Sequence, residues 1–201
     1  YTTKEIISKG VTVLKKSGRN RSRFYVKNSL PILNDQKTLP IEPYLLGLWL
    51  GDGSCRSNTI TASIEDAMFY KDELQKKGIL VNISEDKRQK NTCTIHVQDV
   101  FNTWKGGFNI YRNKHIPEIY FSASYEQRLE LLQGLIDTDG HIMKSGNVEF
   151  YNTDKKLIDQ IKTLVSSLGY KVTIRERDNT GKLTAIHHTK RYKMKNLFVL
   201  N

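Results

Sequence analysis

The chain reads Leu-Leu-Gly-Leu-Trp-Leu-Gly-Asp-Gly at residues 45–53, and a related stretch, Leu-Gln-Gly-Leu-Ile-Asp-Thr-Asp-Gly, follows at residues 132–140. Each copy is an apolar segment of helical character in which two small residues stand four positions apart: Gly47 with Gly51, and Gly134 with Thr138. Residues at i and i+4 share one helix face, so each predicted helix has a flat side that another backbone can approach closely.

Each copy ends in Asp-Gly, and glycine suits a left-handed cap at the end of a helix. If the two flat faces pack together, Asp52 and Asp139 lie side by side at the ends of two parallel helices. A helix C-terminus carries partial negative charge and like charges repel, so both carboxylates are in an unfavourable place. A divalent cation would relieve both problems.

These paired motifs resemble those of the LAGLIDADG homing endonucleases, and the segments before them, residues 39–44 and 122–129, look like the subgroup found inside inteins. The resemblance covers roughly residues 39–190. It implies a monomeric endonuclease that uses Mg²⁺ or Mn²⁺ to cut both strands of a long, pseudo-palindromic or asymmetric double-stranded DNA target. Cleavage across the minor groove with short 3′ overhangs is the implied outcome.

The residues after each motif predict the same order of elements. The first unit is expected to have helices at 43–53 and 65–77 and strands at 59–64, 79–83 and 92–97. The second is expected to have a helix at 125–137, a strand at 147–151, a helix between the cap at 152–154 and Gly169, and strands at 170–177 and 182–188. Helical spacing predicts these buried positions: Ala67, Tyr70, Leu74, Leu129, Leu132, Ile136, Leu157, Ile158, Ile161, Leu164 and Val165.

We therefore predict an α+β fold of two pseudo-symmetric α-β-β-α-β-β units that share a central helix pair. The alternation of polar and apolar residues in the strands gives each antiparallel sheet a polar outer face. Together the two sheets would form a basic, DNA-binding saddle, because strands of this kind can enter the major groove. The expected boundaries are a basic extension at 1–40, a first half with a bridging segment at 41–123, and a second half with a basic tail at 124–201.

Asp52 and Asp139, 87 residues apart, are the leading catalytic and metal-binding candidates. Phosphodiester hydrolysis needs an activated water and stabilisation of the departing oxygen, which divalent ions held by two carboxylates supply. Backbone carbonyls of Gly51 and Thr138 could complete an oxygen ligand set of the kind that Mg²⁺ prefers. A single Asp-Gly after an apolar run would read as a helix stop, whereas two matched copies favour the nuclease. Asp137 breaks the repeat, and we expect it to cap the neighbouring helix or a nearby turn.

Lys114 precedes Ile116-Pro117, and the resemblance implies that a lysine in this segment reaches the active site to polarise water or hold phosphate. A surface lysine before a proline is the alternative. A second lysine should come from the second unit, and the sequence leaves it open among Lys182, Lys190, Lys193 and Lys195. The candidate DNA contacts are Arg56, Lys87, Arg88, Lys171, Arg175 and Arg177.

Charge is unevenly distributed along the 201 residues, whose net charge is +11. Residues 1–40 hold nine Lys/Arg against two acids, 171–201 hold eight against two, and the middle holds fifteen against seventeen. Two basic ends favour a polyanionic partner, although a merely soluble basic protein has the same composition. No apolar run approaches the ~18–20 residues of a membrane span, and two cysteines without a CxxC motif favour an intracellular, reduced protein.

Within residues 1–40, the sequence pattern predicts short strands at 11–14 and 24–26 on either side of a basic turn. An extended linker is expected between Pro31 and Pro40. The basic turn could lie along phosphates or be a solvated hairpin tip. A splicing intein begins with Cys or Ser and usually ends in His-Asn, whereas this chain begins with Tyr1 and ends in Leu200-Asn201. We therefore expect that it does not splice as given.

Two other functions fit the same residues. A protein of this fold could bind nucleic acid without cutting it, as a maturase or a regulator does. It could also be an inactive, degenerate nuclease that retains its motifs. Retention of both Asp-Gly pairs argues against the pure binder, because binding alone does not need two crowded carboxylates.

Overall fold

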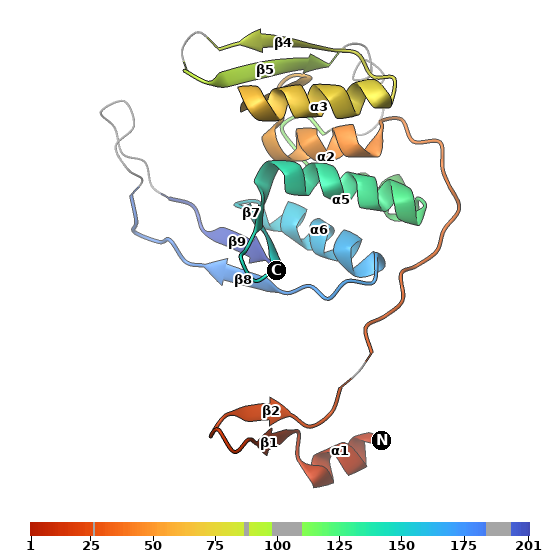
Figure 1. The fold of residues 1–201 in the computed structure, drawn as a ribbon, viewed down its shortest axis with the longest axis vertical. Coiled ribbons are helices and arrows are strands. Elements are labelled where there is room, and N and C mark those ends of the chain that lie inside the picture. Colours follow the sequence, from red (N-terminus) through yellow and green to blue (C-terminus); the bar gives the residue numbers. More distant parts are fainter. Residues whose placement is uncertain (26, 87–88, 98–109, 184–193) are drawn as a thin grey trace.

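The computed structural model describes residues 1–25, 27–86, 89–97, 110–183 and 194–201. Two helices lie side by side at its centre, α2 (Pro43–Asp52) and α5 (Tyr125–Asp139) (Figure 1). Helix α3 (Ile64–Lys76) lies beyond α2, and α6 (Lys155–Ser167) lies beyond α5. Each outer helix belongs to a unit with its own antiparallel sheet, which confirms the predicted mixed fold.

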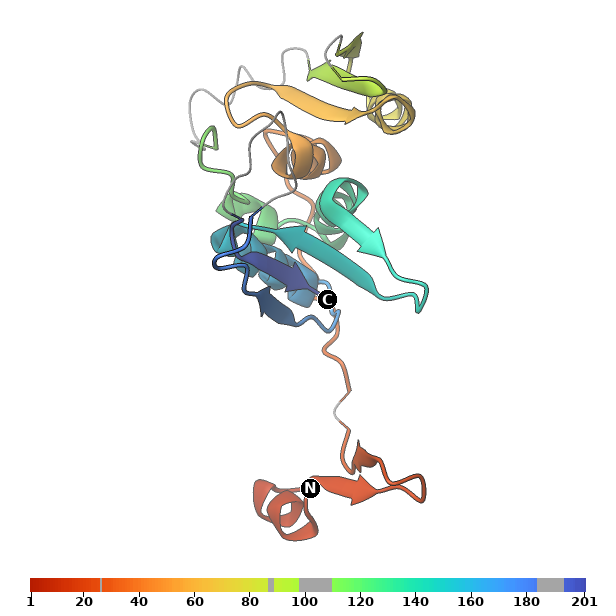
Figure 2. The same ribbon diagram turned by 90° about the vertical axis from the view of Figure 1, so that its left-hand side faces the viewer.

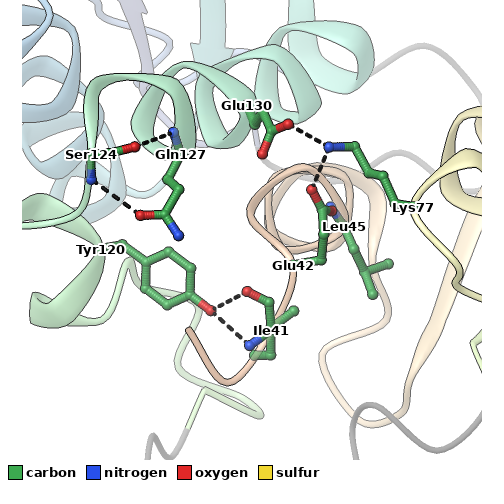
Figure 3. Close-up of polar contacts among 8 residues, drawn as sticks. All are labelled: Ile41, Glu42, Leu45, Lys77, Tyr120, Ser124, Gln127 and Glu130. Atoms are coloured by element: carbon green, nitrogen blue, oxygen red, sulfur yellow. Dashed lines mark hydrogen bonds and ion pairs between the residues drawn. The ribbon is translucent and has the colours of Figure 1, made fainter. Parts of the chain in front are cut away.

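Helix α2 is buried all round, as its continuous apolar sequence requires. Every residue from Pro43 to Leu50 is buried. Proline stands at the first helical position, where its missing N–H costs nothing, and the Glu42 side chain accepts a hydrogen bond from the Leu45 N–H at 2.8 Å. Helix α5 starts with a capping box in which Ser124 and Gln127 satisfy each other's backbone N–H groups (Figure 3).

Close contact between the flat faces of α2 and α5 is confirmed by the space around their glycines. A Cβ added to Gly47 would overlap the Leu131 carbonyl oxygen and lie 2.8 Å from the Leu135 nitrogen. A Cβ added to Gly134 would overlap the Tyr44 carbonyl oxygen. Further along, a Cβ on Gly51 would overlap the Thr138 hydroxyl. Gly47 lies beside Gly134, and Gly51, four residues later, lies beside Thr138, also four residues later. The two helices therefore run parallel, as predicted.

The helix ends differ from the prediction. Gly53 and Gly140, which follow α2 and α5, have extended backbones with φ of −69° and −86°, so the expected left-handed caps are wrong. Each helix runs directly into extended backbone. Glycine is needed there because a Cβ would overlap the carbonyl oxygens of Trp49 and Ile136.

The first sheet has the strand order β3-β5-β4, formed by β3 (Thr59–Ser63), β5 (Thr92–Val97) and β4 (Val81–Glu85). All neighbouring pairs are antiparallel. Gly53 also forms a single bridge with Ile60. Strand β4 starts two residues later than predicted because the Ile79 N–H still bonds the Leu74 carbonyl at the end of α3.

The second sheet has the order β6-β7-β9-β8, all antiparallel, with the bounds β6 (Gly140–Ile142), β7 (Val148–Asn152), β8 (Ile174–Arg177) and β9 (Leu197–Leu200) (Figure 2). Strand β8 is shorter than the predicted 170–177, since the Tyr170 N–H still bonds the Val165 carbonyl after α6. Most of the return strand expected at 182–188 lies outside the described residues. Strand β8 pairs with β9, whose sequence carried no clear signal.

The buried faces of α3 and α6 match the predicted positions in full. Helix α5 differs, because Leu131 and Leu135 are fully buried while Leu129 and Ile136 are only partly so. This helix packs on α2 along one side and on α6 and the short α4 (Glu118–Phe121) along others. Its buried surface is therefore wider than one stripe.

The first residues form a separate small module with α1 (Thr3–Lys9), β1 (Thr12–Leu14) and β2 (Asn20–Ser22), set apart from the two units (Figures 1 and 2). Strand β2 falls earlier than the predicted 24–26. The tight turn fixes this register, since the Lys15 N–H bonds the Arg19 carbonyl at 2.8 Å and Gly18 has φ of +75°.

The segment between Pro31 and Pro40 has no helix or strand, as predicted, but it is fastened to the second unit. Arg128 is fully buried and donates to the carbonyl oxygens of Ile32 and Ser167. Gln127 accepts from the Lys37 N–H at 3.0 Å and donates to the Lys37 carbonyl at 2.6 Å.

The same segment leads into a polar junction between the units. The Tyr120 hydroxyl bonds both backbone groups of Ile41, and Lys77 bridges Glu42 at 2.8 Å and Glu130 at 2.5 Å (Figure 3). Because Glu42 and Lys77 belong to the first unit and Glu130 to α5, these contacts tie the two units together beside the helix pair.

Candidate active site

Asp52 and Asp139 are the last residues of α2 and α5. The close packing of the two helices brings both to the same end of the helix pair. Asp52 is exposed to solvent and Asp139 is half-buried, so both are accessible to a ligand. Gly51 and Thr138, the residues just before the two aspartates, pack against each other, and the charge of Asp139 acts on Asp52.

Both carboxyl groups have pKa values above the ordinary 3.8. For Asp52, the loss of surrounding water raises the pKa most, and the charge of Asp139 raises it further. For Asp139, burial again raises the pKa, while the charge of Lys114 and a hydrogen bond from Asn152 oppose the rise. The site therefore concentrates negative charge that the protein compensates only in part, which is the condition that a bound cation relieves.

Lys114 lies at this site. Its Nζ donates to the Gly51 carbonyl oxygen at 2.6 Å and lies 5.4 Å from the centroid of the Trp49 ring. Burial lowers the pKa of Lys114 even though Asp52 and Asp139 both act to raise it. The prediction that the bridging segment brings a lysine to the aspartates is consistent with this position.

The bridging segment is held in place by backbone contacts. The Ile116 backbone bonds the Gln160 side chain through both its N–H (3.0 Å) and its carbonyl (3.1 Å). The Arg112 N–H donates to the Cys55 carbonyl at 2.8 Å. Lys114 lies between these two attachments, so its backbone is fixed by both units.

The oxygen atoms at the site suit a hard divalent cation. Within the described ranges, no group of three or more His, Cys, Asp and Glu side chains is arranged to hold a metal. Two carboxylates and the carbonyls at the helix ends are the donors offered, a set that fits Mg²⁺ or Mn²⁺ retaining several waters. The Gly51 carbonyl keeps a second lone pair beside Lys114. Thr138 offers its backbone carbonyl, and its hydroxyl shares its one hydrogen between the Gly134 and Leu135 carbonyls.

Asp137 contacts the neighbouring helix but does not cap it. Its Oδ2 accepts from the Tyr44 hydroxyl on α2 at 2.8 Å, and its backbone carbonyl accepts from the Tyr70 hydroxyl on α3 at 2.6 Å. Burial and the Asp137 carboxylate raise the pKa of Tyr44, which keeps this hydroxyl protonated as a donor. Asp137 thus joins three helices through its contacts with Tyr44 and Tyr70.

Asn152 is a site residue that the sequence analysis did not single out. Its Nδ2 donates to Asp139 Oδ2 at 3.3 Å. The expected role in capping α6 belongs to Asp154, whose side chain accepts from the Lys156 and Leu157 N–H groups. Strand alternation was the available signal, because Asn152 shares a face of β7 with the buried Phe150 and so points toward the helices.

Among the described residues, the predicted DNA contacts lie on the second sheet and in loops. Arg175 and Arg177 lie on the outer face of β8 and are exposed, as is Arg56 in the loop after α2. Lys171 is exposed but precedes β8, whereas Lys87 and Arg88 lie outside the described residues. Arg175 is not free, because it pairs with Glu149 at 3.2 Å and its guanidinium lies against the side-chain amide of Asn201.

The second active-site lysine stays a prediction, with four candidates in the second unit. Lys182 Nζ bonds the Asp178 carbonyl and the Asn179 amide oxygen within its own turn. Lys190 and Lys193 lie outside the described residues, and Lys195 is exposed near β9. In the part of the chain that the structure describes, Lys114 is the lysine whose charge acts on both Asp52 and Asp139.

Comparisons with known proteins agree with this arrangement. Residues 126–198 match the family model described as a LAGLIDADG-like domain. The replicative DNA helicase DnaB of Mycobacterium intracellulare is 33% identical over 132 residues, covering 65% of this chain and 19% of the helicase. The homothallic switching endonuclease of Saccharomyces cerevisiae is 24% identical over 165 residues, covering 67% of this chain and 28% of that protein. The chain thus spans less than a third of either relative.

A crystal structure of I-DmoI in complex with DNA and Mn has the same fold, with a TM-score of 0.50. The alignment covers 81% of this chain and 88% of that chain at 19% identity. Among the described residues, no helix is long and apolar enough to cross a membrane.

Proposed function

We propose, from the premise that residues 126–198 carry a LAGLIDADG-like domain within a two-unit fold of that type, that the chain is a homing endonuclease. It would hydrolyse phosphodiester bonds in both strands of a specific double-stranded DNA target. The observation that carries this proposal is the meeting of Asp52, Asp139 and Lys114 at one end of the helix pair. The similarity to the yeast homothallic switching endonuclease and to the DNA-bound I-DmoI structure supports it.

Each residue of the site has a defined contribution. Asp52 and Asp139, with the carbonyls of Gly51 and Thr138, would hold Mg²⁺ or Mn²⁺, which supplies an activated water and stabilises charge on the phosphate. Lys114, with its lowered pKa, releases a proton from Nζ more readily than an exposed lysine and can polarise water or hold phosphate. The close packing of Gly47 on Gly134 sets the separation of the two carboxylates.

A long, asymmetric target is favoured by the unlike outer faces of the two sheets. The first sheet presents hydroxyl, amide and imidazole groups, from Thr59, Thr61, Ser63, Asn82, Ser84, Thr94 and His96. The second presents charged and aromatic groups, from His141, Glu149, Tyr151, Arg175 and Arg177. Because one chain supplies both faces and both aspartates, a monomer suffices.

The match to 19% of a replicative helicase supports a nuclease unit carried within a larger protein, as in the intein-associated subgroup. The units 41–123 and 124–201, with 1–40 as an extension, follow from the paired motifs and the helix order. An intracellular location follows from DNA as substrate.

The first experiment is cleavage of a randomised double-stranded DNA library with Mg²⁺, and again with EDTA. We expect cutting at a defined long site only with the metal, because the two carboxylates require a cation to serve phosphodiester hydrolysis. The Asp52→Asn variant should bind the recovered site with affinity within about threefold of the natural chain while its cleavage falls by at least ~100-fold. Enrichment of bound DNA without cutting, at every metal tested, would instead make the chain a non-cleaving binder.

A further inference from the structure

The register of the two sheets shows which residues occupy matching places beside the two aspartates. After α2, Gly53 bridges Ile60, and after α5, Gly140 pairs with Phe150. Ile60 and Phe150 are both buried against the helices. Two residues further along each strand stand Ala62 in β3 and Asn152 in β7. The pseudo-symmetry of the fold therefore matches Asn152 of the second half with a methyl group in the first.

Asn152 is fixed by contacts at both ends of its amide. Its Oδ1 accepts from the Asp154 N–H at 2.9 Å, so its NH₂ group must point the other way. That group donates to Asp139 Oδ2 at 3.3 Å. Asp154 is itself held as the N-cap of α6. The outer helix of the second unit thus sets the orientation of the Asp139 carboxylate through Asn152.

Within the described ranges, Asp52 lacks a partner equivalent to Asn152. Ala62 has no hydrogen-bond donor in its side chain, and among the described residues no side chain donates to the Asp52 carboxylate. Rotation of Asp52 is therefore less restricted than rotation of Asp139. A carboxylate that a neighbouring side chain already orients loses less conformational entropy when it binds a metal ion.

We propose that Asn152 is a positioning residue that makes the two halves of the active site unequal, so that the two DNA strands are cut at different rates. This inference rests on the proposed endonuclease function. One carboxylate is already oriented for its ligand, while the other must be ordered during the reaction. Nicked DNA should therefore accumulate during cleavage of a single target by the natural chain.

The test compares Asn152→Ala with Ala62→Asn in the full chain, on the target recovered from the library with each strand labelled separately. Asn152→Ala should slow the faster strand by about 10-fold and leave the slower strand within about twofold. Ala62→Asn should raise the rate of the slower strand and reduce the amount of nicked intermediate. Thr153→Ala, an exposed neighbour of Asn152, is the matched control and should change neither rate.

A second measurement separates this inference from the proposed function. Mn²⁺ affinity, measured by electron paramagnetic resonance, should fall about 10-fold in Asn152→Ala and stay unchanged in Thr153→Ala. If the natural chain cuts no DNA, the endonuclease proposal fails, and the Mn²⁺ affinities still decide the role of Asn152. Equal slowing of both strands, or unchanged Mn²⁺ affinity in a folded Asn152→Ala variant, would overturn the positioning role.

Discussion

Asp52 and Asp139 are placed where their charge is unfavourable to the fold. Each ends a helix, each is partly removed from water, and the charge of Asp139 acts on Asp52. Their pKa values are raised, as is common for groups at functional sites. A fold that retains such groups gives up stability in exchange for a binding site.

The first prediction concerns the stability of the metal-free chain. A carboxyl group with a raised folded pKa binds more protons in the folded state, so stability falls as pH rises from its ordinary pKa of 3.8 through the raised value. Above that pH window the loss of stability is complete, and well below pH 3.8 there is no loss of stability. Asp52→Asn should therefore raise the free energy of unfolding at pH 7.5 by roughly 0.5–2 kcal/mol, toward the lower end because Asp52 is exposed.

Thermal unfolding in EDTA at pH 7.5 and near pH 3.5 measures this effect. Asp72→Asn, which removes the same charge from an exposed position of α3, is the control and should not reproduce the gain. A destabilised Asp52→Asn variant at pH 7.5 would mean that the carboxylate has a structural partner instead.

At the scale of the elements, the contact between α2 and α5 determines the site. Gly47 and Gly134 allow the two backbones to touch, and this contact fixes where the last residue of each helix lies. A larger side chain at either position would separate the helices by moving backbone atoms, which cannot rotate away as a side chain can.

The second prediction is that Gly134→Ala lowers both stability and cleavage. Alanine normally stabilises a helix by about 1 kcal/mol relative to glycine. Here the added Cβ overlaps the Tyr44 carbonyl oxygen and lies 2.8 Å from the Leu48 nitrogen, so we expect a loss of roughly 1–3 kcal/mol, typical of overpacking.

Urea unfolding and cleavage rates check this expectation. Gln133→Ala changes the neighbouring, exposed residue of the same helix and should leave both quantities nearly unchanged. If Gly134→Ala were stabilising, the helices would not pack as closely as described.

At the scale of the whole molecule, the two halves share a fold but differ in their outer faces. The first sheet is polar, and the second carries Arg175 and Arg177 beside Glu149. The backbone therefore has approximate two-fold symmetry, whereas the side chains on the two outer faces differ. Its target should have unequal halves.

The third prediction assigns the two faces to different parts of the target. Arg177→Ala should relax base preference in one half of the recovered site, with a loss of about 1–3 kcal/mol at a base pair read bidentately. His96→Ala should act only in the other half. Arg177 is the better test residue, because Arg175 also holds Glu149 and Asn201.

Repeating the library selection with each variant provides the measurement. The base-preference profile of the natural chain is the reference, and each variant serves as the control for the other. Changes at the same base pairs in both variants would contradict the assignment of one sheet to each half.

The sequence by itself determined the features that depend on local pattern and on the repeat. The small residues of the two motifs identified the helix pair, and helical spacing identified the buried faces of α3 and α6. The aspartates followed from the same repeat, because a residue at the end of a helix is placed wherever the helix is placed. Lys114 was indicated by its similarity to a known motif.

Only the tertiary structure decided features that join distant residues. Strand β9 was missed because its pairing with β7 and β8 is set by neighbours far along the chain, and a four-residue strand has little pattern of its own. The left-handed caps were wrong because close contact with Trp49 and Ile136, and not a positive φ, requires the glycines. The contact of Asn152 with Asp139 was not predicted, because only the packing of β7 on α5 brings its amide to that carboxylate. A sequence pattern reports which face a residue occupies, whereas its partner across that face depends on how whole elements pack.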